Sequence, residues 1–163
     1  MAHTVCLLPG DGIGPEVVGA TKRVIEAAGV DIEWVSLPIG ETAIEFCGSV
    51  LPERTIAAIA GHGIALKGPV TTPIGRGHTS VNVQLRKRLK LFAAVRPVRN
   101  LPGIKTRFDN VDMVIIRENT EGLYSGIENE IIPGVAQSLK IATEEACTRI
   151  ARFAFDYAVS RER

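Results

Sequence analysis

The sequence predicts an α/β fold, because short apolar runs alternate along the chain with segments of helical periodicity. Glycine and proline mark where these segments begin and end: Pro15 opens a helix that stops at Gly29, and Pro52 opens another that closes at Gly61. The expected strands are residues 5–9, 32–37, 63–66, 91–95 and 111–116, and the expected helices are 15–29, 52–61, 80–90 and 143–161. Residues 131–141 are expected to form a strand or an extended arm.

The composition excludes several classes of protein. The 163 residues carry a formal charge of +1, whereas a dedicated nucleic-acid binder shows a basic excess. The three cysteines are far apart and lack the spacing of a zinc site or a disulfide framework, which suits a reducing compartment. No apolar run reaches the length of a membrane span, and no signal peptide is recognisable. We therefore expect a cytoplasmic protein without nucleic-acid or membrane partners.

The glycine turn at residues 10–14 lies between a strand and a helix, as a dinucleotide-binding turn would. Its spacing is G-x-G-x-G, however, and the Rossmann fingerprint requires G-x-G-x-x-G. Asp31 and Glu33 lie about 20 residues further on, as the fingerprint's acid does, but any soluble chain supplies such residues. The spacing favours a tight structural turn over a Rossmann cofactor site.

Basic and polar residues indicate an anion site. Ser80 is expected at a helix N-terminus, and Asn82 and Arg86 share one face of that helix at i and i+4. Arg96 and Arg117 are each expected to follow an apolar strand. Guanidinium groups bind carboxylates through paired hydrogen bonds, so the set suits a substrate with several carboxylates. The alternative is a solvated basic helix face, which is favoured for three neighbours of Arg86, namely Lys87, Arg88 and Lys90.

Tyr124 comes after Arg117 in the chain, in a loop rich in turn-forming residues. Beside an arginine-lined site its phenol could serve as a general acid, although the residues alone favour a partly buried packing tyrosine. The histidines, His3, His62 and His78, show no metal-ligand or triad spacing.

Four stretches in order resemble the isocitrate/isopropylmalate dehydrogenase family. They are LLPGDGIGPEV, LKGPVTTPIGRGHTSVNVQLRK, LFAAVRPVRNLPG and VDMVIIRENTEGLYSGIE. Within that family SVNVQLR and ENTEGLYSGIE are most similar to the isocitrate branch, especially its NAD-dependent members. The resemblance implies a sheet with flanking helices that is not a Rossmann fold and is incomplete in this chain. It also implies two domain portions, residues 1–96 of a large domain and 97–163 of a small dimerisation domain with an arm at about 122–141.

The resemblance implies a role for each matching residue. Substrate carboxylates would be bound by Ser80, Asn82, Arg86, Arg96 and Arg117. Tyr124 would be the catalytic proton donor for the enolate. The cofactor segment would contain Lys67, Thr71 and Thr72.

The implied reaction is oxidative decarboxylation of isocitrate to 2-oxoglutarate, with NAD and Mg or Mn as cofactors and a homodimer as the assembly. The family's metal-binding aspartates, catalytic lysine and adenosine-binding segment are expected downstream of this chain, which alone would then be an incomplete catalyst. Two alternatives stay open: a truncated or regulatory homologue that binds isocitrate or citrate without turnover, and an isopropylmalate or homoisocitrate dehydrogenase.

Overall fold

The computed structural model describes residues 2–72 and 80–162, and the chain divides into two compact units. The first unit comprises Met1–Leu89 and the second comprises Lys90–Arg163.

The first unit is built on a parallel sheet of three strands in the order β2-β1-β3. The strands are β1 (His3–Leu8), β2 (Ile32–Ser36) and β3 (Ala65–Lys67). The central strand is the most buried, with Cys6 at 0% and Leu8 at 1% exposure, because it has a neighbour on both sides. Burial also raises the pKa of the Cys6 thiol.

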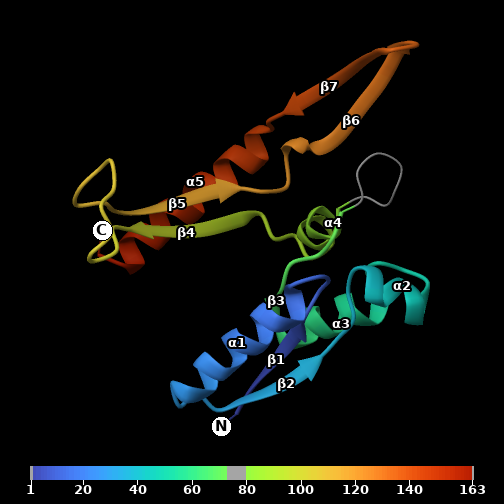
Figure 1. Cartoon of the computed structure of the whole chain (residues 1–163). Coiled ribbons are helices and arrows are strands. Elements are labelled where there is room, and N and C mark those ends of the chain that lie inside the picture. The colour runs from blue at the N-terminus through green and yellow to red at the C-terminus, as the bar shows by residue number, and fades with distance from the viewer. Residues whose placement is uncertain (1, 73–79, 163) are drawn as a thin grey trace. The chain divides into compact units, whose positions relative to one another are not determined.

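Helices connect these strands, as expected for parallel pairing (Figure 1). The helices of the first unit are α1 (Gly14–Ala27), α2 (Glu41–Cys47), α3 (Glu53–His62) and α4 (Val81–Arg88). Its core contains Cys6, Leu8, Ile39, Val50, Leu51, Ile59, Val81 and Leu85. The short helix α2 was not predicted from the sequence. It is bounded by Gly40 and Gly48, both at positive φ, and offers too few turns for a periodic signal.

The second unit contains an antiparallel pair and one long helix. β4 (Ala93–Arg99) pairs with β5 (Asp112–Glu118), and α5 (Glu144–Ser160) packs against β5. Thr143 is the N-cap residue of α5, and its hydroxyl accepts a hydrogen bond from the backbone N–H of Ala146 at 3.2 Å. Phe153 of this helix meets Phe92 edge to face, with ring centroids 5.6 Å apart.

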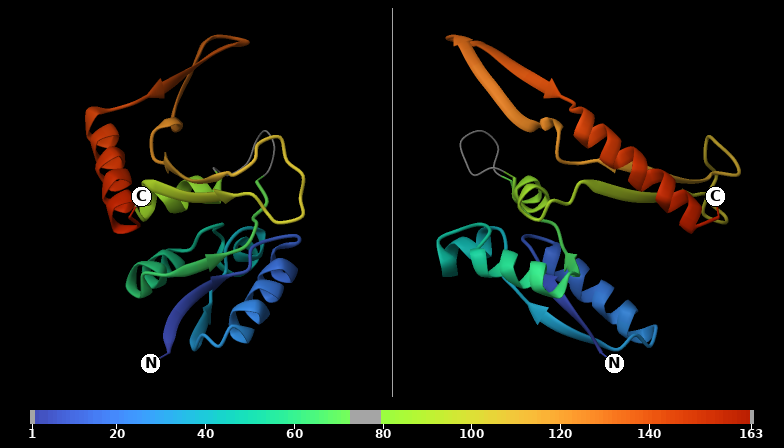
Figure 2. Two further views of the ribbon diagram at one scale, coloured as in Figure 1. Left: turned by 90° about the vertical axis from the view of Figure 1, so that its left-hand side faces the viewer. Right: turned by 180° about the vertical axis from the view of Figure 1, so that it is seen from behind.

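A hairpin of two long strands, β6 (Gly122–Ile132) and β7 (Val135–Ile141), precedes α5. Figure 2 shows it as an extended ribbon that projects beyond the β4–β5 pair of the same unit. The strand or arm expected at 131–141 thus forms the tip and second strand of this hairpin. The apolar pattern did not indicate the first strand, because residues 128–130 are charged or amide side chains with no apolar alternation, whereas the family resemblance implied an arm at about 122–141.

The predicted α/β class is confirmed. The expectation that two arginines follow the ends of apolar strands is wrong. Arg96 and Arg117 lie within β4 and β5 and do not follow them. An antiparallel pair tolerates such residues inside a strand, because one of its faces can remain open to solvent. The domain boundary expected after Arg96 stays a prediction; the first unit ends at Leu89. No helix within the described residues has the length and apolar character needed to cross a bilayer.

We expect Leu8→Ala to destabilise the first unit by about 2–5 kcal/mol, because it leaves a cavity in a fully packed core. Urea unfolding can be followed by the fluorescence of Trp34, the chain's single tryptophan, which lies on β2. Phe46→Ala is the control, since Phe46 is 79% exposed and its loss should change stability by no more than about 0.5 kcal/mol. Equal midpoints for the two variants would contradict this assignment of the core.

Candidate functional site

Two of the predicted arginines lie on the same face of the second unit. In the β4–β5 register Arg96 is opposite Ile115, and Ala94 is opposite Arg117. Paired residues share a face and side chains alternate along each strand, so Arg96 and Arg117 point to the same side. Both arginines are exposed. The ladder therefore presents two guanidinium groups at diagonal positions.

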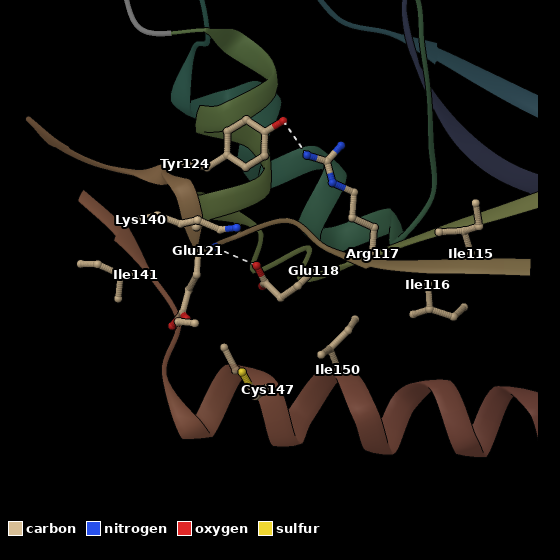
Figure 3. A pocket seen from close by; sticks show the side chains of 13 residues that line it. Ile115, Ile116, Arg117, Glu118, Glu121, Tyr124, Lys140, Ile141, Cys147 and Ile150 are labelled. Carbon is tan, nitrogen blue, oxygen red and sulfur yellow. Dashed lines mark hydrogen bonds between the residues drawn. The ribbon is translucent and has the colours of Figure 1, made fainter. Parts of the chain in front are cut away.

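Tyr124, on β6, extends this cationic surface. Arg117 donates a hydrogen bond from Nη2 to the Tyr124 hydroxyl at 3.0 Å, and its guanidinium carbon lies 5.5 Å from the ring centroid. Figure 3 shows the two side chains meeting on one side of β5. The structure thus brings together the proposed proton donor and one of the proposed carboxylate-binding groups.

Glu118, the residue after Arg117, points to the opposite side of β5, toward α5 (Figure 3). Its carboxylate accepts hydrogen bonds from the backbone N–H groups of Thr120 and Glu121, both at 2.8 Å, and from the Thr120 hydroxyl. Arg149 of α5 lies 3.6 Å from the same carboxylate. Burial alone would raise the pKa of Glu118, but these hydrogen bonds outweigh it and hold the pKa below its usual value.

The connection between β5 and β6 is fixed at further points. The backbone N–H of Asn119 donates to the carbonyl oxygen of Phe92 at 2.9 Å. The Glu121 carboxylate accepts from the backbone N–H of Thr143 at 2.8 Å and from its hydroxyl at 2.7 Å. The short segment that separates Arg117 from Tyr124 is therefore tied to β4 and to the start of α5, so the spacing of the two side chains is set by the fold of this unit.

A cavity of about 610 Å³ adjoins these groups. Its apolar lining comes from β5, β7 and α5 and includes Ile116, Ile141 and Ile150. Its polar lining combines Arg117, Tyr124 and Lys140 with the carboxylates of Glu118 and Glu121 (Figure 3). Such a mixture of apolar wall and a few convergent polar groups is typical of small-molecule sites. Sequence reasoning did not single out Lys140, which reaches this lining only because β7 pairs with β6.

In the first unit, α4 carries the other predicted substrate residues. Val81 and Leu85 are buried, so they fix one face of the helix in the core. Ser80 is the N-cap residue as expected, and its side chain makes no capping hydrogen bond. Asn82 and Arg86 are half-buried at i and i+4 on this helix. Ser80, Asn82 and Arg86 thus follow the predicted helical arrangement.

The solvated-face interpretation holds for the neighbouring basic residues Lys87, Arg88 and Lys90, all of which are exposed. Arg88 forms an ion pair with Glu53 of α3. Surface pairs of this kind contribute little to stability or binding.

The predicted cofactor residues follow β3. Lys67 ends this strand and is half-buried, while Thr71 and Thr72 are exposed in the segment after it. Burial lowers the pKa of Lys67, and the nearby charge of Arg86 lowers it further; the carboxylate of Asp11 acts in the opposite direction. Lys67 and Arg86, from different elements, are therefore close enough to interact electrostatically.

Asp11 is the residue of this region that sequence reasoning missed. It lies in the glycine turn, is only 6% exposed, and accepts backbone hydrogen bonds from two distant segments. The sequence offered one signal for Asp11, an acid between two glycines. It could not indicate the hydrogen-bond partners, because they are far away in the chain. No group of three His, Cys, Asp or Glu side chains able to hold a metal occurs within residues 2–72 and 80–162.

The candidate residues thus form two sets, one in each unit. Lys67, Thr71, Thr72, Ser80, Asn82 and Arg86 belong to the first, and Arg96, Arg117 and Tyr124 belong to the second. Within each set the residues come from different elements of one α/β protein, and both sets are rich in groups that bind anions.

Residues 4–163 match the family model described as isocitrate/isopropylmalate dehydrogenase. The chain belongs to this family. That finding confirms the resemblance seen in the sequence and agrees with an α/β fold that is not a Rossmann fold.

Curated relatives divide between several roles. The chain is 50% identical to a mitochondrial protein of Dictyostelium discoideum that is named as a regulatory subunit of NAD isocitrate dehydrogenase, over 98% of this chain and 43% of the relative. It is 48% identical to a mitochondrial protein of Arabidopsis thaliana that is named as a catalytic subunit of the same enzyme, again over 98% and 43%. Identity to the chloroplastic 3-isopropylmalate dehydrogenase of Solanum tuberosum is 46%, over 96% of this chain and 44% of the relative. The chain spans less than half the length of these relatives.

Among solved structures, the crystal structure of isocitrate dehydrogenase from Methylococcus capsulatus is similar, with a TM-score of 0.91 and 46% identity. The match covers 99% of this chain and 49% of that one.

The expected cytoplasmic location is contradicted, because the isocitrate dehydrogenase relatives from Dictyostelium and Arabidopsis are named mitochondrial proteins. Composition could not have revealed this. Unpaired cysteines and a mixed-charge surface are compatible with any reducing aqueous compartment.

We expect Glu118→Gln to lower the free energy of unfolding near neutral pH by about 1–3 kcal/mol, because it weakens the charge-assisted hydrogen bonds to Thr120 and Glu121. The pKa of Glu118 is lowered by folding, so its contribution is fully present above the unfolded value of about 4.3 and is lost as pH falls through the folded pKa. Thermal unfolding by circular dichroism across acidic pH should show the two proteins converging. Glu128→Gln, on the exposed hairpin, is the control; a wild-type advantage that persisted in strong acid would contradict the role of Glu118.

Proposed function

We propose that this chain supplies the substrate-binding part of an NAD-dependent isocitrate dehydrogenase, which converts isocitrate to 2-oxoglutarate and CO₂. The observation that carries the proposal is the hydrogen bond from Arg117 to the Tyr124 hydroxyl, on the face of the β4–β5 pair that also bears Arg96. It joins a cation that can hold a carboxylate to a group that can deliver a proton.

Charge complementarity supports the choice of substrate. Isocitrate carries three carboxylates, and the guanidinium groups of Arg86, Arg96 and Arg117 would bind them by paired hydrogen bonds. Ser80 and Asn82 would contact the carboxylate that distinguishes isocitrate from shorter relatives. Ser80 begins α4, where unpaired backbone N–H groups and the helix dipole favour an anion.

Tyr124 would protonate the enolate that remains after CO₂ leaves. Its oxygen accepts the hydrogen bond from Arg117, so the phenol's own O–H is the donor for transfer. The hydrogen bonds of Glu118 and Glu121 hold the intervening segment, which keeps the phenol in place during the reaction.

NAD, when bound, would accept the hydride from the substrate alcohol. Lys67, Thr71 and Thr72 would lie near it, since the two exposed hydroxyls and the ammonium group come from one short segment and offer donors and a positive charge to a nucleotide. Mg or Mn remains part of the proposal by family, but the described residues provide no ligand cluster for it.

A non-catalytic, ligand-binding role is the second candidate, because the relative named as a regulatory subunit is 50% identical and the one named as a catalytic subunit is 48% identical. Isopropylmalate or homoisocitrate dehydrogenation is the alternative within the enzymes, and a relative named 3-isopropylmalate dehydrogenase is 46% identical. Overall identity does not separate these functions.

Self-association belongs to the proposal as well, as a homodimer or with related subunits. The β6–β7 hairpin exposes apolar side chains on one face: Ile127 pairs with Leu139, and Ile132 pairs with Val135. A two-stranded hairpin with an open apolar face is only marginally stable by itself. A second subunit that covered this face would bury its apolar side chains and so stabilise the hairpin.

We expect Ser80→Glu to weaken isocitrate binding at least about a hundredfold, because the new carboxylate would face one of the substrate's and like-charge contacts cost several kcal/mol. Isothermal titration of the purified chain with isocitrate measures this. Ser80→Gln is the matched control, since it adds the same bulk without the charge and should bind more tightly than the glutamate variant. Unchanged affinity in Ser80→Glu would remove Ser80 from the site.

We expect Tyr124→Phe to leave isocitrate affinity within about threefold and to abolish most turnover, since general acid catalysis contributes about 10²–10⁴. NADH formation from isocitrate and NAD, with Mg or Mn, is the assay. Tyr157→Phe removes the chain's other tyrosine and should leave both quantities unchanged. Isocitrate binding by the wild type without NADH formation fits both the non-catalytic role and an incomplete catalyst, so the turnover comparison then requires Tyr124→Phe in the full-length protein, and preferred turnover of isopropylmalate would favour the other alternative.

A further inference from the structure

The glycine turn between β1 and α1 is not explained by a phosphate-binding role. Gly10 and Gly12 both have positive φ, of 79° and 57°, and Asp11 lies between them with its side chain buried. A buried carboxylate needs hydrogen-bond donors to offset its lost hydration. The positions of those donors show which segments of the chain the turn holds together.

Asp11 joins three segments of the first unit. Its Oδ1 accepts a hydrogen bond from the backbone N–H of Glu41 at 2.9 Å, and its Oδ2 accepts one from the backbone N–H of Thr71 at 3.0 Å. Its own backbone N–H donates to the carbonyl oxygen of Pro69 at 2.9 Å. The bonds with Thr71 and Pro69 hold the segment after β3. The bond from Thr71 has a carboxylate acceptor, which makes it stronger than a bond between neutral groups.

Glycines allow this close approach. A Cβ on Gly10 would lie 1.8 Å from the carbonyl oxygen of Pro69, and a Cβ on Gly40 would lie 2.1 Å from Oδ2 of Asp11. In contrast, a Cβ on Gly12 would meet nothing within 4 Å. The turn is therefore packed against the segment at Gly10 and open at Gly12, although both glycines have a conformation that other residues rarely adopt.

The segment held in this way begins at Lys67, whose ammonium group donates a hydrogen bond to the carbonyl oxygen of Gly68. The backbone N–H of Gly68 donates to the carbonyl oxygen of Leu8 at 2.8 Å, so the segment is also hydrogen-bonded to the end of β1. Thr71, whose side chain is exposed, is fixed through its backbone by Asp11. Exposed groups on an anchored backbone are suited to contact a ligand with little loss of entropy.

We propose that Asp11 is a positioning residue, whose carboxylate holds residues 67–72 in the conformation in which Lys67, Thr71 and Thr72 contact NAD. This inference rests on the cofactor role assigned to those residues in the proposed function. Asp11 itself would touch no ligand. It acts through the backbone N–H of Thr71.

Two glycine variants provide the test. Gly10→Ala and Gly12→Ala both place a side chain at a positive φ in the same turn, but only the first brings a Cβ onto the carbonyl oxygen of Pro69. Asp11→Ala removes the carboxylate, and Asp11→Asn keeps one acceptor oxygen. Trp34 fluorescence shows that each variant is folded, amide hydrogen exchange at Thr71 reports the segment, and titration with NAD reports binding.

We expect Gly10→Ala and Asp11→Ala to speed exchange at Thr71 and to weaken NAD binding at least tenfold, with Asp11→Asn between them and the wild type. Gly12→Ala should lower only the unfolding midpoint. Wild-type exchange at Thr71 in folded Asp11→Ala would overturn the proposal, as would faster exchange with undiminished NAD affinity. If the wild-type chain binds no NAD without the adenosine-binding segment expected downstream, the NAD titrations are made with the same variants in the full-length protein, where failure of the wild type to bind would refute the cofactor assignment; exchange at Thr71 decides in either case whether Asp11 holds the segment.

Discussion

The alternation of side chains along β5 organises the second unit. Consecutive residues of a strand point to opposite faces, so Arg117 projects beside Tyr124 while Glu118 projects toward α5 and Arg149. One face carries groups that can bind an anion, and the other carries the contacts that keep the site in shape. A register shift of one residue would exchange the two faces and remove both functions at once.

Carboxylates that bind backbone N–H groups are a recurring device in both units. Glu118 and Glu121 fix the segment between β5 and β6 and the start of α5, and Asp11 fixes the segment after β3. Each buries or half-buries an acid, a cost that the hydrogen bonds offset. The anchored backbone then presents its exposed side chains with little freedom. Loops that carry ligand groups gain precision in this way without a larger apolar core.

Family membership and site chemistry constrain function to different degrees. The family fixes the type of reaction that related whole proteins perform, whereas the proposed choice of isocitrate over a shorter substrate rests on a few side chains, above all Ser80 and Asn82 at the start of α4. Catalytic competence depends on further groups, among which Tyr124 is this chain's candidate. Overall similarity weighs all positions equally, so it is insensitive to both distinctions.

The sequence by itself determined the α/β class and most of the elements, because proline, glycine and apolar periodicity act locally. It also identified the arginines and Tyr124 as candidates. It did not reveal α2, which is too short for a periodic signal, or that Arg96 and Arg117 share a face, which follows from the pairing of Ala94 with Arg117. The partners of Asp11, 30 and 60 residues away, were equally hidden. Strand register and buried hydrogen bonds join distant parts of the chain, so only the tertiary structure could decide them.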